Sequence, residues 1–328
     1  METIKFMVFS DLHVDIMHDS IKRVKEVIRV AAAEKVDFIL SLGDTLYPPN
    51  DVLLRNNVQI RKDRWFYCDR DTEKHELLDL MNKCGIPFYH VIGNHDSDCC
   101  PKKVFTDYMG MEHNYYCFDI KGLRFAAIDT SYIYYDGKYI PYENRNLESL
   151  ENAIYPCVPE EQLEWLKKVT QTADKPVIVL SHHQLHGEGD GVENHERVKA
   201  VINKINRDKK RIILCLTGHS HLDGIQIHNG VPYIDINSLS CHWVGDLYTH
   251  DHYNNAEMAE AYPYMSSVAP YKSPVFACYT INREGISIKG YSSEIVGPSP
   301  YELGMQENSR HYTVTAAIAD RYIPFGTQ

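Results

Sequence analysis

Residues 4–13 read IKFMVFSDLH, a short apolar run that ends in an acid and a histidine two positions apart. Such a run, rich in β-branched and aromatic side chains, is typical of a buried strand. An amphipathic helix is expected over residues 20–34, and a second strand over 38–42 leads into Gly43-Asp44. A strand, a helix and a strand in this order predict the βαβ opening of an α/β fold. In α/β folds, functional residues follow the carboxyl ends of the strands.

The pairing of an apolar run with a polar cluster recurs three more times. Residues 88–92 precede Gly93-Asn94-His95-Asp96, residues 177–180 precede His182-His183, and residues 212–216 precede Gly218-His219-Ser220-His221. Each cluster is therefore expected at the end of a strand. Further strands are expected over 115–120, 123–129, 225–228, 231–236, 275–281 and 286–291, and helices over 72–84 and 159–169.

Spacing within the clusters indicates metal ligands. Residues two apart on an extended segment project to the same side, so Asp11 with His13 could grip one ion, and so could His219 with His221. The two oxygens of a single carboxylate, that of Asp44, could bridge two cations. Each cluster taken alone also fits a turn or a core histidine, but five such clusters in order favour one site.

The five clusters, which span residues 11–221, resemble the signature of the calcineurin-like metallophosphoesterases: D-x-H, GD, GNH[DE], H and GHxH in that order. This resemblance implies a four-layer α/β/β/α sandwich of two mixed sheets with outer helices. It also implies that one metal is held by Asp11, His13, Asp44 and His221, and a second by Asp44, Asn94, His182 and His219. His95 would be catalytic, with Asp96 placed to orient its ring.

The expected cofactor is a pair of divalent or mixed-valence transition metal ions. Carboxylate, amide and imidazole ligands without a thiolate favour Mn, Fe or Zn. The expected reaction is hydrolysis of a small-molecule phosphate mono- or diester through attack by a metal-bridging hydroxide. His95 would donate a proton to the leaving oxygen.

Two alternative functions remain open at this stage. A metal-dependent nuclease is disfavoured, because 45 acidic residues outnumber 34 lysines and arginines and no broad basic stripe lies outside residues 55–70. A catalytically silent binding scaffold of the same fold is disfavoured, because every expected ligand is present together with His95. The expected partner is therefore a small phosphate ester, and a nucleic acid is disfavoured.

The chain is expected to form one catalytic domain over residues 1–291 and a C-terminal extension over 292–328, with one strand near 311–317. Residues 241–272, rich in histidine and tyrosine, are expected to form a loop; the family resemblance implies that it covers the site, and a self-packed surface loop is the alternative. Residues 45–72 are expected to form a long connection, of the kind that often serves as a lid, and its basic residues fit a solvated face or a phosphate contact. Without a run of about 20 apolar residues, no membrane span is expected. Nine cysteines without a C-x-x-C pair favour a reducing, cytoplasmic location.

Overall fold

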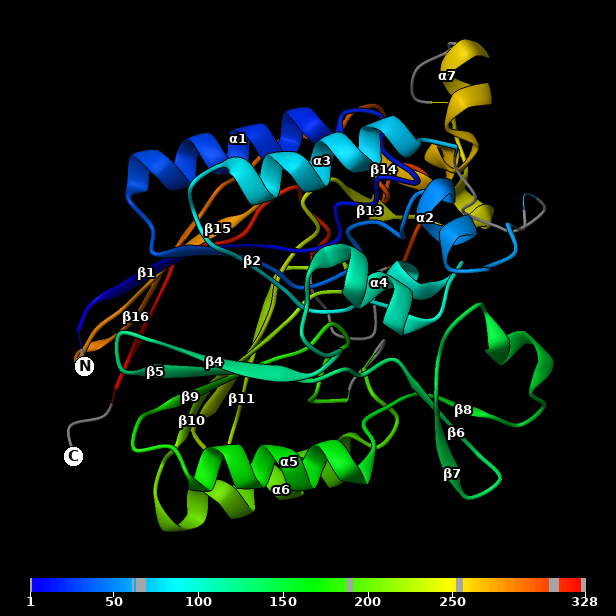
Figure 1. Ribbon diagram of the computed structural model, residues 1–328. Coiled ribbons are helices and arrows are strands. Elements are labelled where there is room, and N and C mark those ends of the chain that lie inside the picture. The colour runs from blue at the N-terminus through cyan, green and yellow to red at the C-terminus, as the bar shows by residue number, and fades with distance from the viewer. Residues whose placement is uncertain are drawn as a thin grey trace.

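Two six-stranded mixed sheets stack face to face, and helices cover the outer face of each (Figure 1). The structure is a computed structural model that describes residues 2–60, 62, 69–187, 191–251, 256–306 and 313–325. The predicted four-layer α/β/β/α sandwich is confirmed.

The first sheet has the order β17-β16-β15-β1-β2-β3. Its strands are β17 (Arg321–Pro324), β16 (Gly285–Gly290), β15 (Ala277–Ile281), β1 (Ile4–Phe9), β2 (Phe38–Ser41) and β3 (Phe88–His90). β1, β2 and β3 run parallel, whereas β15, β16 and β17 add antiparallel strands on the other side of β1. The carboxyl ends of the three parallel strands therefore lie at one edge of the sheet.

The second sheet has the order β11-β12-β10-β9-β5-β4. Its strands are β11 (Gly224–His228), β12 (Val231–Asp235), β10 (Ile212–Thr217), β9 (Val177–Leu180), β5 (Leu123–Ala127) and β4 (Tyr116–Ile120). The four central strands are parallel, and the hairpins put β11 and β4 at the two edges. As predicted, Lys121 and Gly122 connect β4 to β5.

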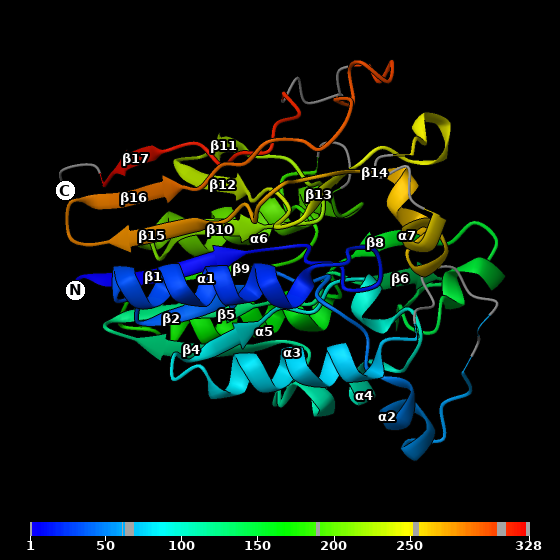
Figure 2. The same ribbon diagram turned by 90° about the horizontal axis from the view of Figure 1, so that it is seen from above.

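Successive side chains of β1 point to opposite faces of the sheet, so β1 can pack against the second sheet on one face and against helices on the other. Phe6 and Val8 pack into the core between the sheets, whereas Met7 and Phe9 pack into the core under the first pair of helices. That pair is α1 (Ser20–Glu34) and α3 (Asp71–Lys83), and α5 (Glu160–Gln171) with α6 (His195–Asp208) covers the second sheet (Figure 2). Sequence patterns predicted three of these four helices, and α6 was missed.

Several small elements lie near one end of the sandwich, on the side away from the two termini (Figure 1). They include α2 (Asn50–Arg55), α4 (Lys102–Met109), α7 (Ala256–Ala261) and a three-stranded sheet of β6 (Tyr132–Tyr135), β7 (Lys138–Pro141) and β8 (Ile154–Cys157). The long connection predicted over 45–72 contains α2 and the start of α3, and residues 61 and 63–68 of it fall outside the described residues.

Two expectations about irregular segments are wrong. Residues 241–272 are not a plain loop, because β13 (Cys241–Trp243) and β14 (Val268–Pro270) pair there and α7 lies between them; residues 252–255 are not described. No strand forms over 313–317, the described part of the strand expected near 311–317. The extension instead supplies β17, and no helix within the described ranges is both long and apolar enough to cross a bilayer.

Candidate metal centre

The polar clusters meet where the carboxyl ends of the parallel strands come together. Backbone hydrogen bonds join the first two clusters, from the Asp11 amide to the Gly43 carbonyl and from the His13 amide to the Asp44 carbonyl, both 3.0 Å long. The two sheets are joined by the His219 amide, which donates to Asp11 Oδ2 at 3.0 Å. Residues more than 200 positions apart are thereby fixed against one another.

A first group of candidate ligands consists of Asp11, His13 and His221, all buried. Asp11 Oδ1 lies 3.3 Å from His221 Nε2 and 3.8 Å from His13 Nε2, and the two Nε2 atoms are 3.2 Å apart. The three side chains offer ligand atoms that all lie within 4.8 Å of one another. This spacing suits a single cation held by one carboxylate and two imidazoles.

A second group consists of Asp44, His182 and His219, within the same mutual distance of 4.8 Å. Asp44 Oδ2 lies 3.0 Å from His182 Nε2 and 3.9 Å from His13 Nε2 of the first group. Its other oxygen, Oδ1, accepts the His95 amide at 2.8 Å. Only Oδ2 of Asp44 therefore faces both groups, and this oxygen is the candidate bridge between them.

Hydrogen bonds to the backbone orient two of the imidazoles. His182 Nδ1 donates to the Leu42 carbonyl at 2.8 Å, and His221 Nδ1 donates to the Cys241 carbonyl at 2.8 Å. Since a carbonyl oxygen can only accept, Nδ1 carries the proton and the Nε2 lone pair of each neutral ring points at the carboxylates. This tautomer is the one that metal-ligating histidines adopt.

One buried oxygen, Asn94 Oδ1, has no hydrogen-bond partner among the described residues, which fits a metal site. Two other buried atoms, Asp11 Oδ1 and His182 Nε2, have only the side chains of the two groups as neighbours, His221 Nε2 at 3.3 Å and Asp44 Oδ2 at 3.0 Å. Leaving a polar atom unpaired in the interior costs about 1–3 kcal/mol. Oxygen and nitrogen donors aimed at a common space are what a divalent transition ion requires.

The charges at the centre shift the pKa values of its groups strongly. Burial alone would raise the pKa of Asp44, but His182 and His95 beside it hold that pKa well below its usual range. Burial opposes protonation of His182, yet Asp44 and Asp11 raise its pKa to about 9. Burial and the neighbouring His182 lower the pKa of His219 to about 3. The carboxylates thus stay ionised and favour positive charge next to them.

The candidate ligands adopt a backbone conformation that the sequence patterns did not anticipate. Asp11, His13, Asp44, His219 and His221 all have left-handed φ, between 51° and 68°. The expectation that Asp11 and His13 share one side of an extended segment is therefore wrong, because β1 ends at Phe9 and both residues lie in the turn after it. Non-glycine residues in this region are strained, and such strain clusters at functional sites.

Close packing explains the glycine of the third cluster. A Cβ atom on Gly93 would lie 2.1 Å from Asp44 Oδ1 and 2.4 Å from the Asp44 amide. No side chain fits there unless Asp44 moves away from its place between the two groups. Gly93 is thus required by the centre and not only by the turn.

His95 stands beside the first group, with its ring centroid 5.4 Å from that of His13. Its Nδ1 lies 2.6 Å from Asp98 Oδ2, and the Tyr142 hydroxyl donates to Asp98 Oδ1 at 2.5 Å. Burial opposes protonation, but Asp98 and Asp44 raise the pKa of His95 to about 10. The ring is thereby fixed in orientation and favoured in its protonated form.

With this geometry in place, the comparison with known proteins is decisive. The sequence model of the calcineurin-like phosphoesterases matches residues 4–223, two thirds of the chain. The chain belongs to the calcineurin-like phosphoesterase family. A search of curated protein sequences gave no match to this chain.

Solved structures similar to this chain have low sequence identity to it. A dimetal phosphatase from Danio rerio has 15% identity and a TM-score of 0.58, over 90% of this chain and 99% of that protein. GAP50, the anchor in the inner membrane complex of Plasmodium, has 17% identity and a TM-score of 0.49, over 89% of this chain and 84% of that protein. At these identities the likeness concerns the fold alone.

The structure corrects which residue orients the His95 ring. Asp96 does not contact the ring, because its carboxylate accepts the backbone amides of Gly93, Asp44, Thr45 and Leu46 at 2.8–3.0 Å. Burial and the nearby Asp44 raise the pKa of Asp96 to about 7. Asp96 therefore joins the Gly43-Asp44 cluster to the Gly93–Asp96 cluster. Asp98 is the residue that contacts the His95 ring, the position that was expected for Asp96.

Sequence reasoning missed Asp98 and Tyr142. The signal for Asp98 is present, because residues three apart line up on a 3₁₀ helix and η1 (His95–Ser97) begins at the catalytic candidate. Tyr142 gives no such signal, since it lies 44 positions further along the chain, after β7. Only the folded structure brings its hydroxyl to Asp98.

Proposed function

We propose that this chain is a dinuclear metal-dependent phosphoesterase that hydrolyses a small-molecule phosphate mono- or diester. One observation carries the proposal. Two groups of mostly buried carboxylates and imidazoles share the Asp44 Oδ2 oxygen as a common neighbour, and within each group the ligand atoms lie within 4.8 Å of one another. Family membership supports phosphoester hydrolysis as the chemistry of such a centre.

The proposed ligands of the first metal are Asp11, His13, Asp44 and His221, and those of the second are Asp44, Asn94, His182 and His219. When bound, two divalent ions polarise the phosphoryl oxygens and lower the pKa of a water molecule. Mn, Fe and Zn suit the oxygen and nitrogen donor set best.

The chain's own residues position the proton that the leaving oxygen requires. Asp98 holds the His95 ring through the 2.6 Å contact at Nδ1, which leaves Nε2 as the atom able to donate a proton. The 2.5 Å hydrogen bond from Tyr142 fixes the Asp98 carboxylate from its other oxygen. In this proposal His95 is the catalytic acid, and Asp98 and Tyr142 are positioning residues.

Cysteine chemistry supports a reducing location, which we infer to be the cytoplasm. Each of the eight cysteines within the described ranges is a free thiol, and five of them are buried. Structural disulfides would be expected in an oxidising compartment.

The experiment is a paired measurement of metal content and turnover. Wild-type protein is loaded with Mn²⁺, the bound metal is counted by elemental analysis, and hydrolysis of p-nitrophenyl phosphate and bis-p-nitrophenyl phosphate is assayed. Two ions per chain and metal-dependent turnover are expected, with both lost in Asp44→Asn. Asp79→Asn, an exposed acid paired with Lys83, serves as the control. Two bound ions without turnover on any ester would instead favour a binding scaffold.

A further inference from the structure

The two helices that cover the second sheet, α5 and α6, lie side by side (Figure 2), and a groove of about 660 Å³ opens beside their carboxyl ends. Its walls come from the second half of α5, from the end of α6 and from the turn before β10. We call it the basic groove, because five of its lining residues are cations and one is an acid. They are Lys167, Lys168, Lys204, Lys209, Arg211 and Glu164.

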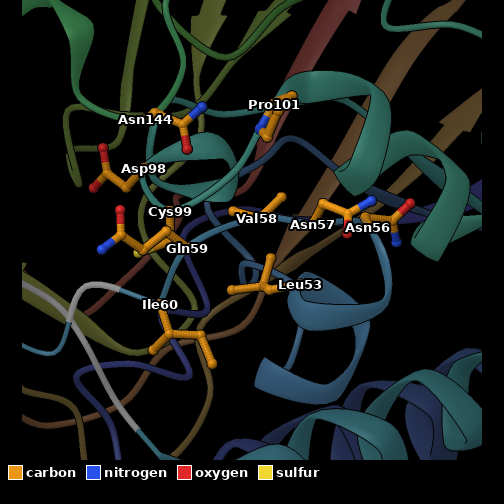
Figure 3. Close-up of a pocket in the computed structure, with 10 residues that line it drawn as sticks. All are labelled: Leu53, Asn56, Asn57, Val58, Gln59, Ile60, Asp98, Cys99, Pro101 and Asn144. Atoms are coloured by element: carbon orange, nitrogen blue, oxygen red, sulfur yellow. The ribbon is translucent and has the colours of Figure 1, made fainter.

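The basic groove lies apart from the metal centre. α5 leads into β9 and α6 leads into β10, so these helices end near the amino ends of the two strands, whereas the candidate ligands follow the carboxyl ends. A smaller cavity of about 380 Å³ does adjoin the catalytic candidate, because Asp98 is part of its wall (Figure 3). None of the described residues lines both. A ligand in the basic groove would therefore bind away from the reacting atoms.

The charges in the basic groove do not cancel. The carboxyl end of each helix carries a partial charge of about −0.5, and Glu164 adds a full negative charge. Asp208 ends α6 and adds at most one more, although its side chain is not among the described ones. Five lining cations exceed this negative charge of about −3 in total. In a chain of net charge −11, the groove thus has an excess of about two positive charges.

Most of these cations have no acidic partner. Lys167 pairs with Glu164 on the surface of α5. Within the part of the chain that the structure describes, no ion pair or hydrogen bond engages the side chains of Lys168, Lys204, Lys209 and Arg211. Like charges that gather without partners repel one another, and an anion between them would relieve the repulsion.

Backbone hydrogen bonds hold the turn that carries Lys209 and Arg211. Asn206 Oδ1 accepts the amides of Arg211 and Ile212 at 3.1 and 2.9 Å. The Arg211 carbonyl accepts the Val177 amide at 2.7 Å, which anchors the turn to β9. Binding therefore requires less ordering of the chain than it would in a mobile loop.

A buried hydroxyl also belongs to the lining. Thr170 is fully buried, and its Oγ1 atom has no hydrogen-bond partner among the described residues. A buried polar atom without a partner is unfavourable, and an oxygen of an anion in the groove would supply the missing acceptor. The lining thus offers a neutral donor in addition to the cations.

The lining chemistry favours a compact anion with phosphate groups. The guanidinium of Arg211 offers a planar fork that matches phosphate oxygens, and the lysines offer point charges. A nucleic acid would also require a stacking surface, but no lining residue in the described ranges is aromatic, and Ile205 is the one apolar side chain among them. The volume of about 660 Å³ is typical of small-molecule sites.

We propose that the basic groove binds a small anion that carries several phosphate groups, at a site separate from the metal centre. Lys209 and Arg211 from one wall and Lys168 from the other surround the phosphate oxygens, and Thr170 donates a hydrogen bond to them. The inference does not rest on the proposed function, since it uses none of the residues of the centre.

The first test measures the affinity by calorimetry, with tripolyphosphate titrated into the full chain at the same metal content for every variant. We expect saturable binding to wild type. Lys209→Gln combined with Arg211→Gln should raise the Kd about tenfold or more, because charge-assisted hydrogen bonds to phosphate are lost. Thr170→Val, which keeps every charge, should also raise the Kd, because it removes the hydroxyl donor.

The matched control removes the same charge from the exposed face of α1. Lys25→Gln combined with Arg29→Gln should leave the Kd within about twofold of wild type, since both side chains lie on the other helical layer. No saturable binding to wild type, an equal rise of the Kd in this control, or an unchanged Kd in Thr170→Val would overturn the site.

The second test locates the anion and identifies its class. Tripolyphosphate should slow the acetylation of Lys168, Lys204 and Lys209, followed by mass spectrometry, but not that of Lys83, an exposed lysine on α3. Equal protection of Lys83 would overturn the location. An oligothymidylate of about twelve nucleotides should bind more weakly than tripolyphosphate, because the groove offers no stacking surface. Tighter binding of the oligonucleotide would overturn the small anion in favour of a nucleic acid.

Turnover separates the groove from the centre. Hydrolysis of p-nitrophenyl phosphate by Lys209→Gln combined with Arg211→Gln should stay within about twofold of wild type, because neither residue reaches the centre. A large fall in this variant would overturn the separation of the two sites. If wild type itself hydrolyses no ester, the proposed function fails, and the calorimetry still decides whether the groove binds the anion.

Discussion

Replacing Asp98 with asparagine tests the assignment of His95 as a proton donor, because it removes a charge without changing the size of the side chain. The buried carboxylate contacts His95 Nδ1 at 2.6 Å and helps raise the pKa of that ring to about 10. An amide in its place neither stabilises the imidazolium nor fixes its tautomer. The loss should therefore appear only where the leaving oxygen needs a proton.

The expected magnitude follows from general acid catalysis, which contributes about 10²–10⁴-fold to rates. For glycerol phosphate, an alkyl ester, Asp98→Asn should lower kcat about 10²-fold or more, equivalent to about 2.7 kcal/mol in the barrier. For p-nitrophenyl phosphate, whose leaving group departs as a stable anion, the fall should stay below about tenfold. The leaving-group dependence of kcat is the readout that a merely structural role would not move.

The controls exclude loss of fold or of metal. Asp107→Asn, an exposed acid on α4 that pairs with Lys103, should leave both rates unchanged. Bound metal should be the same in Asp98→Asn and wild type, and the variant should still be folded at the assay temperature. Equal losses on the alkyl and aryl esters, or no loss on either, would refute the proton-donor reasoning.

Three further predictions concern the core, the centre and the acid stability. Phe125→Ala removes a fully buried ring that packs against Phe6 and should lower the free energy of unfolding by about 3–5 kcal/mol in urea titrations; a change below about 1 kcal/mol would contradict the packing. Gly93→Ala forces Asp44 aside, so calorimetry should find Mn²⁺ affinity at least about tenfold weaker; unchanged affinity would count against this account. Hydrogen bonds from Lys289 and Lys5 lower the pKa of Glu34 from 4.5 to about 2, so the stability that this carboxylate adds is present above pH 4.5 and lost as the pH falls towards 2. Urea midpoints of wild type and Glu34→Gln should therefore differ at pH 7 and converge near pH 2, and a constant difference would refute the linkage.

Short apolar runs with clear boundaries made the strands predictable, whereas the four-layer sandwich followed from the resemblance to the family. Residues 4–9 and 177–180 form β1 and β9 as expected, because buried strands need a continuous apolar sequence when both faces are covered. The small sheet of β6, β7 and β8 was not predicted. β8 pairs with β6 about 20 residues away, and no local pattern shows such pairing.

Local sequence patterns also failed to predict the conformation and contacts of single residues in the site. Motif order predicted that Asp11 and His221 come from distant segments to one place, and their side chains lie 3.3 Å apart. The left-handed backbone at both residues was not predictable from their spacing in the sequence. It depends on hydrogen bonds between segments that lie far apart along the chain. Asp96 and Asp98 both follow His95 closely, and only the turn of η1 decides that Asp98 faces the ring.

The most direct test of the central claim is anomalous scattering from crystals of the full chain grown with Mn²⁺. We expect two peaks, one bounded by Asp11, His13 and His221 and the other by Asp44, His182 and His219, with Asp44 Oδ2 contacting both. A single peak, or peaks that do not touch these residues, would contradict it.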